Sequence, residues 1–375
     1  MKRPLRSAAL VLAGTALIAC TYGLVRYAFG LAAPEAQRDL GLSTTTVGVV
    51  SGATSVAYCL AAGLAFLCCQ RWPRAVVAGA GGVAALGALG VWSAGSAAGF
   101  SVAVVLGSAG AGAASPGLVV LVDRAVPGPG QDDAQALVNA GTGPGLVAAA
   151  LLAQLLGSRW QTAWWVSAAV TAVVTVLVLL LAPRGAGEDA GAVPVDAGRR
   201  WAAPLAGAGL LGAGSAVVWT HGRSVLQDGG LAGSTAVWVW LALGVGATGA
   251  AVVAPRWLRG GVRRAWTAAL GCTAAGVGGL AVPPVGPVPF VAAAAFGLGF
   301  TVGTTVLIAW AAQVSTTPGP AVSALFVALL LGQAVGAPLS SVLLTAGVLP
   351  AFALAAAVTL TALTALPLPA GHPPR

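Results

Sequence analysis

Residues 163–220 read AWWVSAAVTAVVTVLVLLLAPRGAGEDAGAVPVDAGRRWAAPLAGAGLLGAGSAVVWT. The stretch begins and ends with apolar runs and has a segment rich in glycine, proline and charge between them. Each apolar run is long enough to cross a bilayer as a helix, because a spanning helix takes about 20 apolar residues. The middle segment resists packing, as a flexible connector does. This stretch therefore predicts two membrane helices joined by a long polar loop.

The composition of the whole chain extends this pattern. Its 375 residues are 58% hydrophobic and 7% charged, with a mean hydropathy of +0.92. A water-facing surface needs roughly a quarter to a third of its positions charged, so 27 charged side chains cannot cover a soluble protein of this length. The net charge of +9 does not indicate nucleic acid, because nearly all the basic residues lie in loops or at span ends. We expect the lipid bilayer to be the solvent.

Apolar segments recur along the chain, and we predict an all-α membrane protein with twelve of them. They cover residues 8–33, 45–69, 75–94, 99–122, 134–157, 163–182, 203–220, 234–254, 265–283, 287–312, 320–346 and 348–366. The polar connector divides them six from six. This predicts an N-terminal six-helix bundle over 1–183, a cytoplasmic linker over 184–202 and a C-terminal six-helix bundle over 203–375.

The distribution of basic residues predicts the orientation. With a cytoplasmic N-terminus, 14 of the 18 Lys and Arg residues fall on the cytoplasmic side, three fall outside and one lies within a span. Cytoplasmic loops of membrane proteins carry such an excess. We therefore expect a multi-pass protein of the cytoplasmic membrane with both termini in the cytoplasm.

Residues that could support catalysis are scattered. The nine acidic residues lie in loops or at span ends, and the five cysteines form no CxxC pair or Cys/His set. A membrane enzyme would need paired carboxylates or a metal cluster facing a pocket. We predict no enzyme, no metal and no cofactor. A polytopic membrane enzyme and a non-transporting sensor or assembly factor stay open as alternatives.

Arg26 is the most informative single residue. It lies about 16 residues into the first span, hence about 24 Å from the inner end, and charge at that depth is a functional hypothesis by default. In one interpretation its guanidinium binds an anionic or strongly polar ligand, helped by the hydroxyls of Tyr22 and Tyr27. In the other, equally open, it reaches outward or pairs with Glu35 or Asp39.

Span 7 offers a rough counterpart in Arg223, next to Trp219. A charge at the water-facing end of the span is the favoured interpretation of Arg223. If both arginines faced one cavity, the site would be cationic at its outer end. We count Trp219 and Arg223 as candidate substrate-binding residues, together with Gln333, and name Tyr58, Trp310 and Gln313 as further candidates to line a cavity.

Two spans contain glycine and proline in patterns that favour bending. In span 5, glycines at 141, 143 and 145 follow Asn139 and allow close backbone approach, while Pro144 removes a backbone hydrogen bond. In span 11, Gly336 and Pro338 have the same character. We predict gating hinges at Asn139, Gly141, Gly143, Pro144, Gly145, Gly336 and Pro338, with simple tight packing as the alternative.

Taken together, twelve spans in two halves, a long middle loop and basic loops after spans 2 and 8 resemble the major facilitator superfamily. Gly63 followed by a loop with Arg71 and Arg74 is similar to the family's motif between spans 2 and 3. Residues 139–145 resemble the Gly-Pro motif found in antiporters. Residues 22–30, 219–223 and 332–338 resemble a bacterial branch of poorly characterised permeases with an arginine in the first span.

The resemblance implies a secondary transporter of a small solute that works by alternating access, and we expect the protein to be a monomer. The resemblance places the cavity between the halves, lined by spans 1, 4, 7 and 10. Organic-anion transport and efflux are both compatible with it. Proton coupling stays open, because no carboxylate lies well inside a span and the aspartate usual in the loop between spans 2 and 3 is replaced near Cys69 and Gln70.

Overall fold

The computed structural model describes residues 2–126, 128, 130–184, 201–315 and 318–366. Within these ranges every regular element is a helix. Most of the predicted linker over 184–202 lies outside the described residues, as do residues 367–375, so the assignment of the linker as a separate segment stays a prediction.

The first half of the chain makes six crossings, two of which are interrupted. Its elements are α1 (Lys2–Ile18), the π-helix η1 (Ala19–Arg26), α2 (Ala28–Leu40), α3 (Thr44–Cys68), α4 (Pro73–Trp92), α5 (Ala97–Ala125), α6 (Gln131–Asn139), α7 (Thr142–Leu156) and α8 (Trp160–Leu181). The elements α1, η1 and α2 follow one another as one long crossing, and α6 and α7 form another. The first span is thus longer than the predicted 8–33, because the helix continues to Leu40.

The second half makes the other six. Its elements are α9 (Ala202–Asp228), α10 (Gly233–Arg259), α11 (Val262–Gly279), α12 (Val288–Val314), α13 (Pro318–Leu344), α14 (Val348–Thr361) and the short 3-10 helix η3 (Ala362–Thr364). Ten helices in the described residues are long and apolar enough to span a membrane by length and composition, and Val348–Thr364 is a shorter apolar helix. With α11 and α14 counted as crossings, the number is the predicted twelve. The predicted all-α membrane fold is confirmed.

Local sequence explains where several helices begin and end. The Ser43 side chain accepts a hydrogen bond from the Thr46 backbone N–H at 3.0 Å and caps α3, as serine favours at this position. Pro73 occupies the first position of α4, where its missing N–H costs nothing. Gly41 ends α2 with φ of 71°, a left-handed conformation that glycine adopts without steric cost.

The bundle has two ends, which we name by the chain segments found there. The linker end is where α8 ends and α9 begins, and the far end is where α2 and α9 end. Basic side chains hold helices together at the linker end. Arg6 donates to the carbonyl of Leu181 at 3.0 Å and Arg74 to that of Ala182 at 3.1 Å.

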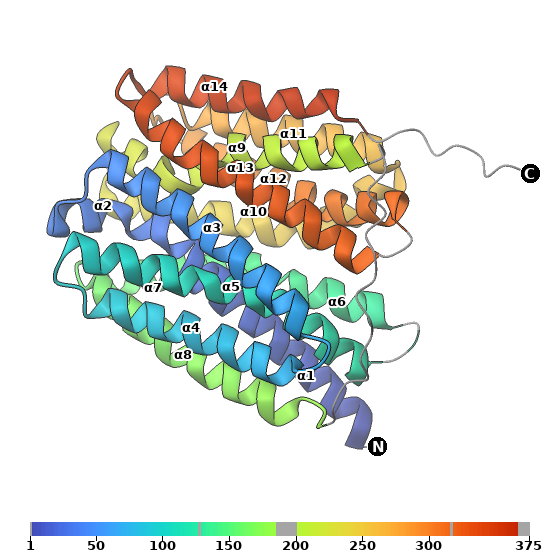
Figure 1. Ribbon diagram of the computed structural model, residues 1–375. Coiled ribbons are helices and arrows are strands. Elements are labelled where there is room, and N and C mark those ends of the chain that lie inside the picture. Colours follow the sequence, from blue (N-terminus) through green and yellow to red (C-terminus); the bar gives the residue numbers. More distant parts are fainter. Residues whose placement is uncertain (1, 127, 129, 185–200, 316–317, 367–375) are drawn as a thin grey trace, which may run out of the picture.

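The two halves of the chain form adjacent groups of helices (Figure 1). In the first group α4 packs on α5 and α8, and in the second α9 packs on α13 and α14. The groups meet where α3 lies against α13, α7 against α10 and α2 against α9. In each half the first, second and fifth crossings therefore make these contacts. The first crossings meet each other, and the second crossing of each half meets the fifth crossing of the other.

Span 5 is broken before its proline. The helix stops at Asn139 and resumes at Thr142, so Pro144 is the third residue of α7. Proline has no N–H to donate to the carbonyl four residues earlier. For Pro144 that carbonyl belongs to Ala140, which lies in the break between α6 and α7. By contrast, α13 runs through Gly336 and Pro338 without interruption. That these positions move during function stays a prediction.

Glycines let the interrupted helices approach each other. A Cβ on Gly23 of η1 would lie 2.2 Å from the backbone carbon of Gly145, and a Cβ on Gly145 would lie 2.3 Å from the carbonyl oxygen of Ala19. Real Cβ atoms essentially never come so close. Gly145 was predicted from its spacing, and its backbone fixes the position of η1, which carries Arg26.

Candidate functional site

Arg26 is the last residue of the π-helix η1. The Tyr27 N–H donates to the carbonyl of Tyr22, five residues back, at 2.8 Å. A π-helical turn adds a residue to the normal turn, which changes the direction of the following side chains, and such turns are frequent at functional sites. The Arg26 side chain is buried, with 5% of the residue exposed. The alternative in which it reaches outward is therefore wrong.

The Arg26 guanidinium contacts both halves of the chain. Its Nη2 donates to Ser55 Oγ of α3 at 3.1 Å and to Gln333 Oε1 of α13 at 3.0 Å. The guanidinium carbon lies 5.0 Å from the ring centre of Tyr27 and 5.1 Å from that of Tyr58, within the range of cation–π attraction. Neither Glu35 nor Asp39 bonds to Arg26, because each has another partner described below.

Several donors at this point lack acceptors. Arg26 Nε, Arg26 Nη1 and Gln333 Nε2 are buried and have no hydrogen-bond partner among the described residues. A small cavity of about 20 Å³ lies beside them. It is lined by Arg26, Tyr27, Phe29, Gly30, Ser51, Thr54, Ser55, Ala216, Trp219, Thr220 and Gln333. The predicted candidates Arg26, Tyr27, Trp219 and Gln333 thus share one cavity between the halves.

Tyr22 takes a different place from the one predicted for it. Its hydroxyl lies 2.6 Å from the hydroxyl of Tyr58 and 3.0 Å from Ser115 Oγ of α5. It therefore supports the site through Tyr58, whose ring lies against Arg26, and does not line the cavity itself.

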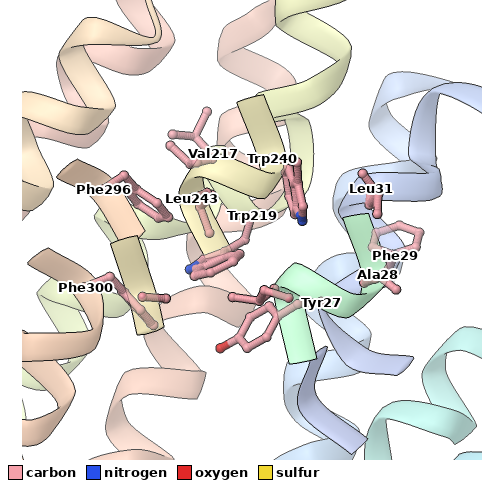
Figure 2. Close-up of a cluster of buried hydrophobic side chains, with 14 of the residues drawn as sticks. Tyr27, Ala28, Phe29, Leu31, Val217, Trp219, Trp240, Leu243, Phe296 and Phe300 are labelled. Atoms are coloured by element: carbon pink, nitrogen blue, oxygen red, sulfur yellow. The ribbon is translucent and has the colours of Figure 1, made fainter. Parts of the chain in front are cut away.

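Trp219 lines the cavity from the second half of the chain and lies in a cluster of buried side chains from both halves (Figure 2). Its ring lies 4.2 Å from that of Tyr27 across the interface. Behind it, Phe296 and Phe300 pack edge-on at 5.2 and 5.3 Å. Edge-to-face pairs at such distances are favourable arrangements of aromatic rings, so this cluster holds the Trp219 ring in place.

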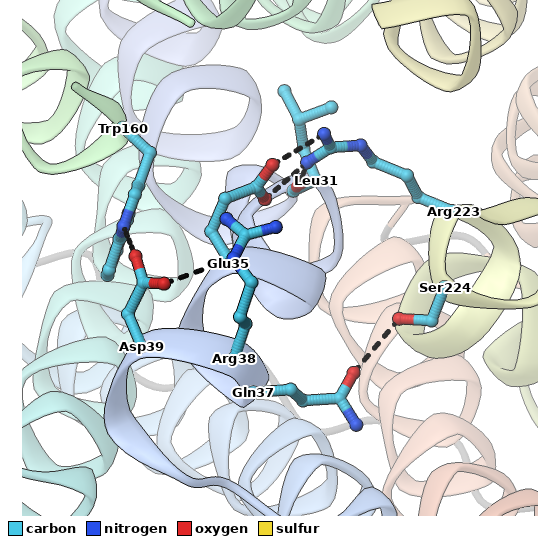
Figure 3. Close-up of polar contacts among 8 residues, drawn as sticks. All are labelled: Leu31, Glu35, Gln37, Arg38, Asp39, Trp160, Arg223 and Ser224. Carbon is cyan, nitrogen blue, oxygen red and sulfur yellow. Dashed lines mark hydrogen bonds and ion pairs between the residues drawn. The ribbon is translucent and has the colours of Figure 1, made fainter. Parts of the chain in front are cut away.

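Arg223 does not face the Arg26 cavity. It is buried, with 4% of the residue exposed, and it pairs with Glu35 through bonds of 2.5 and 2.6 Å (Figure 3). It also donates to the carbonyl of Leu31. The interpretation of Arg223 as a water-facing end charge is wrong, because α2 continues past the predicted end of span 1 and brings a carboxylate to it.

A second, larger cavity lies on this side of the interface. It has a volume of about 380 Å³, and both members of the Glu35–Arg223 pair line it, as does Arg38. Nearby, Asp39 accepts a bond from Trp160 Nε1 at 2.8 Å and one from Arg38 Nε at 3.1 Å. The single cationic cavity containing both Arg26 and Arg223 is therefore not formed in this structure.

The remaining predicted residues lie away from the Arg26 cavity. Gly63 has open space around its Cα, and Arg71 stacks over Trp72 at 4.9 Å. Trp310 packs against Trp266 in the core of the second half, and Gln313 is exposed. In the described part of the chain, no group of three or more His, Cys, Asp or Glu residues is placed to hold a metal ion.

Residues 15–325 match the sequence profile of the Major Facilitator Superfamily. A search of curated proteins finds no match. The nucleoside transporter NupG has a similar structure, with a TM-score of 0.76 at 15% identity over 97% of this chain and 98% of that one. A D-xylose-proton symporter gives 0.73 at 15% identity over 96% of both chains. A bacterial homologue of the human lysosomal transporter Spinster has a TM-score of 0.71 at 15% sequence identity, and the match covers 98% of this chain and 95% of that one.

Proposed function

This chain belongs to the Major Facilitator Superfamily, and on that basis we propose that it is a secondary transporter whose solute is a small organic anion bound by Arg26. The family and the fold establish a membrane transporter and not an enzyme. The solute class is argued from the site.

The observation that carries the proposal is the state of the Arg26 guanidinium. It is buried between the halves, and within the described part of the chain it bonds only to the neutral groups Ser55 and Gln333, which leaves the three N–H bonds of Nε and Nη1 without a partner. An ionised group away from water is costly unless it is paired and hydrogen-bonded. A carboxylate or phosphate on the solute would provide both the charge and the acceptors, since a guanidinium binds such groups through parallel hydrogen bonds.

The contacts between the halves support alternating access from an inward-facing state. The Glu35–Arg223 pair, the bond from Ser224 to Gln37 and the bond between Ser51 and Thr220 lie between the centre and the far end. The linker end carries most of the basic side chains, so we place it in the cytoplasm. Both termini then lie in the cytoplasm, and the far end is the side closed to the outside.

The interrupted fifth crossing is the proposed moving element. Gly141 and Gly145 of this crossing pack on α1 and η1, where a Cβ would meet backbone atoms. The neighbouring Gly143 packs on Thr248 of α10 in the other half. A change of angle at Ala140 would therefore move the helix that carries Arg26 relative to the second half.

Transport by reconstituted protein tests the proposal. We would measure uptake and exchange in proteoliposomes with mono- and dicarboxylates, phosphate esters, neutral sugars and zwitterionic amino acids. Arg26→Gln should reduce flux of the accepted anion by about 10- to 100-fold, because a hydrogen bond to a charged group contributes about 1.5–3 kcal/mol. Arg159→Gln, which removes the same charge at an exposed position, is the matched control.

Two results would contradict the proposal. Accepted solutes that are all neutral or cationic would remove the reason for a buried guanidinium at the site. Saturable binding without any movement of solute across the membrane would instead indicate a sensor or assembly factor.

A further inference from the structure

The cavity beside Arg26 presents donors that outnumber the available acceptors. Gln333 Oε1 is already used by Arg26 Nη2, and the Ser55 hydroxyl, which also accepts from Arg26, donates to the Ser51 carbonyl. The Ser51 hydroxyl is bonded to that of Thr220. Among the described residues that line this cavity, the buried side-chain atoms without a partner are Arg26 Nε, Arg26 Nη1, Gln333 Nε2 and Trp219 Nε1, all of which only donate. A species that only accepts hydrogen bonds fits this set.

Charge leads to the same conclusion. The interior of the interface holds two guanidiniums, Arg26 and Arg223, and one carboxylate, Glu35. Glu35 is bound by Arg223 through both oxygens, so it is not available to Arg26. The exposed Arg38–Asp39 pair does not involve Arg26 either. One positive charge at Arg26 is therefore uncompensated, and water alone would fill its hydrogen bonds without balancing it.

The volume restricts the size of the partner. About 20 Å³ of the cavity is open to a water-sized sphere, and roughly 10–15 Å³ on this measure is enough for one water molecule. A single small ion fits, whereas an organic solute fits only after the halves separate. Arg26, Gln333 and Trp219 are each more than nine-tenths buried, so the cavity is built into the interface and is not a surface feature.

We propose that this cavity is a binding site for one monatomic monovalent anion, chloride under physiological conditions, which the organic solute displaces when the halves separate. The identity of the competing solute rests on the proposed function, whereas the ion site itself does not depend on it. In this arrangement chloride neutralises Arg26 while the cavity is small, and the anionic group of the solute replaces it in the open state.

Gln333 offers a sharp test because its side chain already touches Arg26. Gln333→Glu places a built-in carboxylate within reach of the guanidinium and should make chloride unnecessary. Arg26→Gln removes the charge and should also abolish the effect. Gln313→Glu makes the same chemical change on the exposed surface of α12 and is the matched control.

We would measure the melting temperature of purified protein in sodium chloride and in sodium sulfate at equal ionic strength. The wild-type protein and Gln313→Glu should show a saturable rise with chloride, and bromide should substitute for chloride. Arg26→Gln and Gln333→Glu should show no rise. Anomalous scattering from bromide in crystals of the wild-type protein should place one ion at Arg26.

The outcomes separate this inference from the proposed function. The ion site is overturned if chloride still raises the melting temperature of both Arg26→Gln and Gln333→Glu, or if the crystals show bromide only at places other than Arg26. Chloride binding as described, with no organic anion transported, leaves the site standing and overturns the proposed solute class. Arg26-dependent transport of an organic anion with no effect of chloride overturns this inference alone.

Discussion

The Glu35–Arg223 ion pair is the feature whose removal gives the largest predicted change in conformation. It joins α2 to α9 across the interface, and in the proposed inward-facing state it holds the far ends of the two halves together. Glu35→Gln keeps the shape and one acceptor but removes the negative charge. We expect this variant to shift the equilibrium from the inward-facing to the outward-facing state.

The size of the shift follows from burial. The side chains of Arg223 and Glu35 are 5% and 13% exposed, and removing one partner of a buried pair costs about 3–5 kcal/mol. The Leu31 carbonyl still accepts from Arg223, so we take the lower figure. About 3 kcal/mol is lost only by the inward-facing state, because separation of the halves exposes Arg223 to water. This is roughly a 150-fold change in the equilibrium between the two states.

Distance measurements between the far ends of the halves would check this. Spin labels at Thr45→Cys and Val285→Cys, both exposed positions at the far end, would report the separation in a background without the five native cysteines. Glu35→Gln should move most of the population to longer distances. Arg38→Gln is the control, since the Arg38 and Asp39 side chains are 64% and 43% exposed and such pairs contribute about 0–1 kcal/mol. An unchanged distance distribution in Glu35→Gln would refute the reasoning.

Three further variants test packing at the site and away from it. Gly23→Ala should lower the melting temperature and the yield of folded protein sharply, because its Cβ would lie 2.2 Å from the backbone carbon of Gly145. Gly63→Ala should leave thermal stability within about 0.5 kcal/mol of wild type, because open space surrounds that glycine; a large loss would indicate a contact made only in another conformation. Tyr58→Phe removes the 2.6 Å bond to Tyr22 but keeps the ring against Arg26, so solute affinity in a flux assay should fall by about tenfold or less.

The fold could be predicted from the sequence because lipid imposes a simple rule. Every spanning helix must satisfy its own backbone and cover about 30 Å of hydrocarbon, so apolar length alone locates it. Arg26 could be predicted for the related reason that charge stands out in such a segment. The face of α3 could also have been recognised, because Ser51, Thr54, Ser55 and Tyr58 recur at the spacing of one helix face.

Other features depend on where separate helices meet, which spacing does not reveal. Glu35 falls outside the predicted span 8–33, with the acidic residues expected in loops or at span ends, whereas the helix continues to Leu40. Its partner Arg223 lies 188 residues away. The π-helical turn at Ala19–Arg26 likewise has no signal in the sequence pattern, and neither does the close approach of η1 to the backbone of Gly145.

Arg26 and Gln333 together suggest how solute binding favours one conformation. Their direct bond joins η1 to α13, so each half of the transporter provides one donor side chain to the same point. A ligand drives a conformational change only by binding the two states with different affinity. An organic solute enters after the halves separate, and its carboxylate gains bonds from both Arg26 and Gln333 only when the halves then draw together around it, in a state with a wider cavity than the one described here. Gln333→Ala should therefore weaken closure around the solute more than the first encounter with it, and lower the maximal rate of exchange more than the apparent affinity.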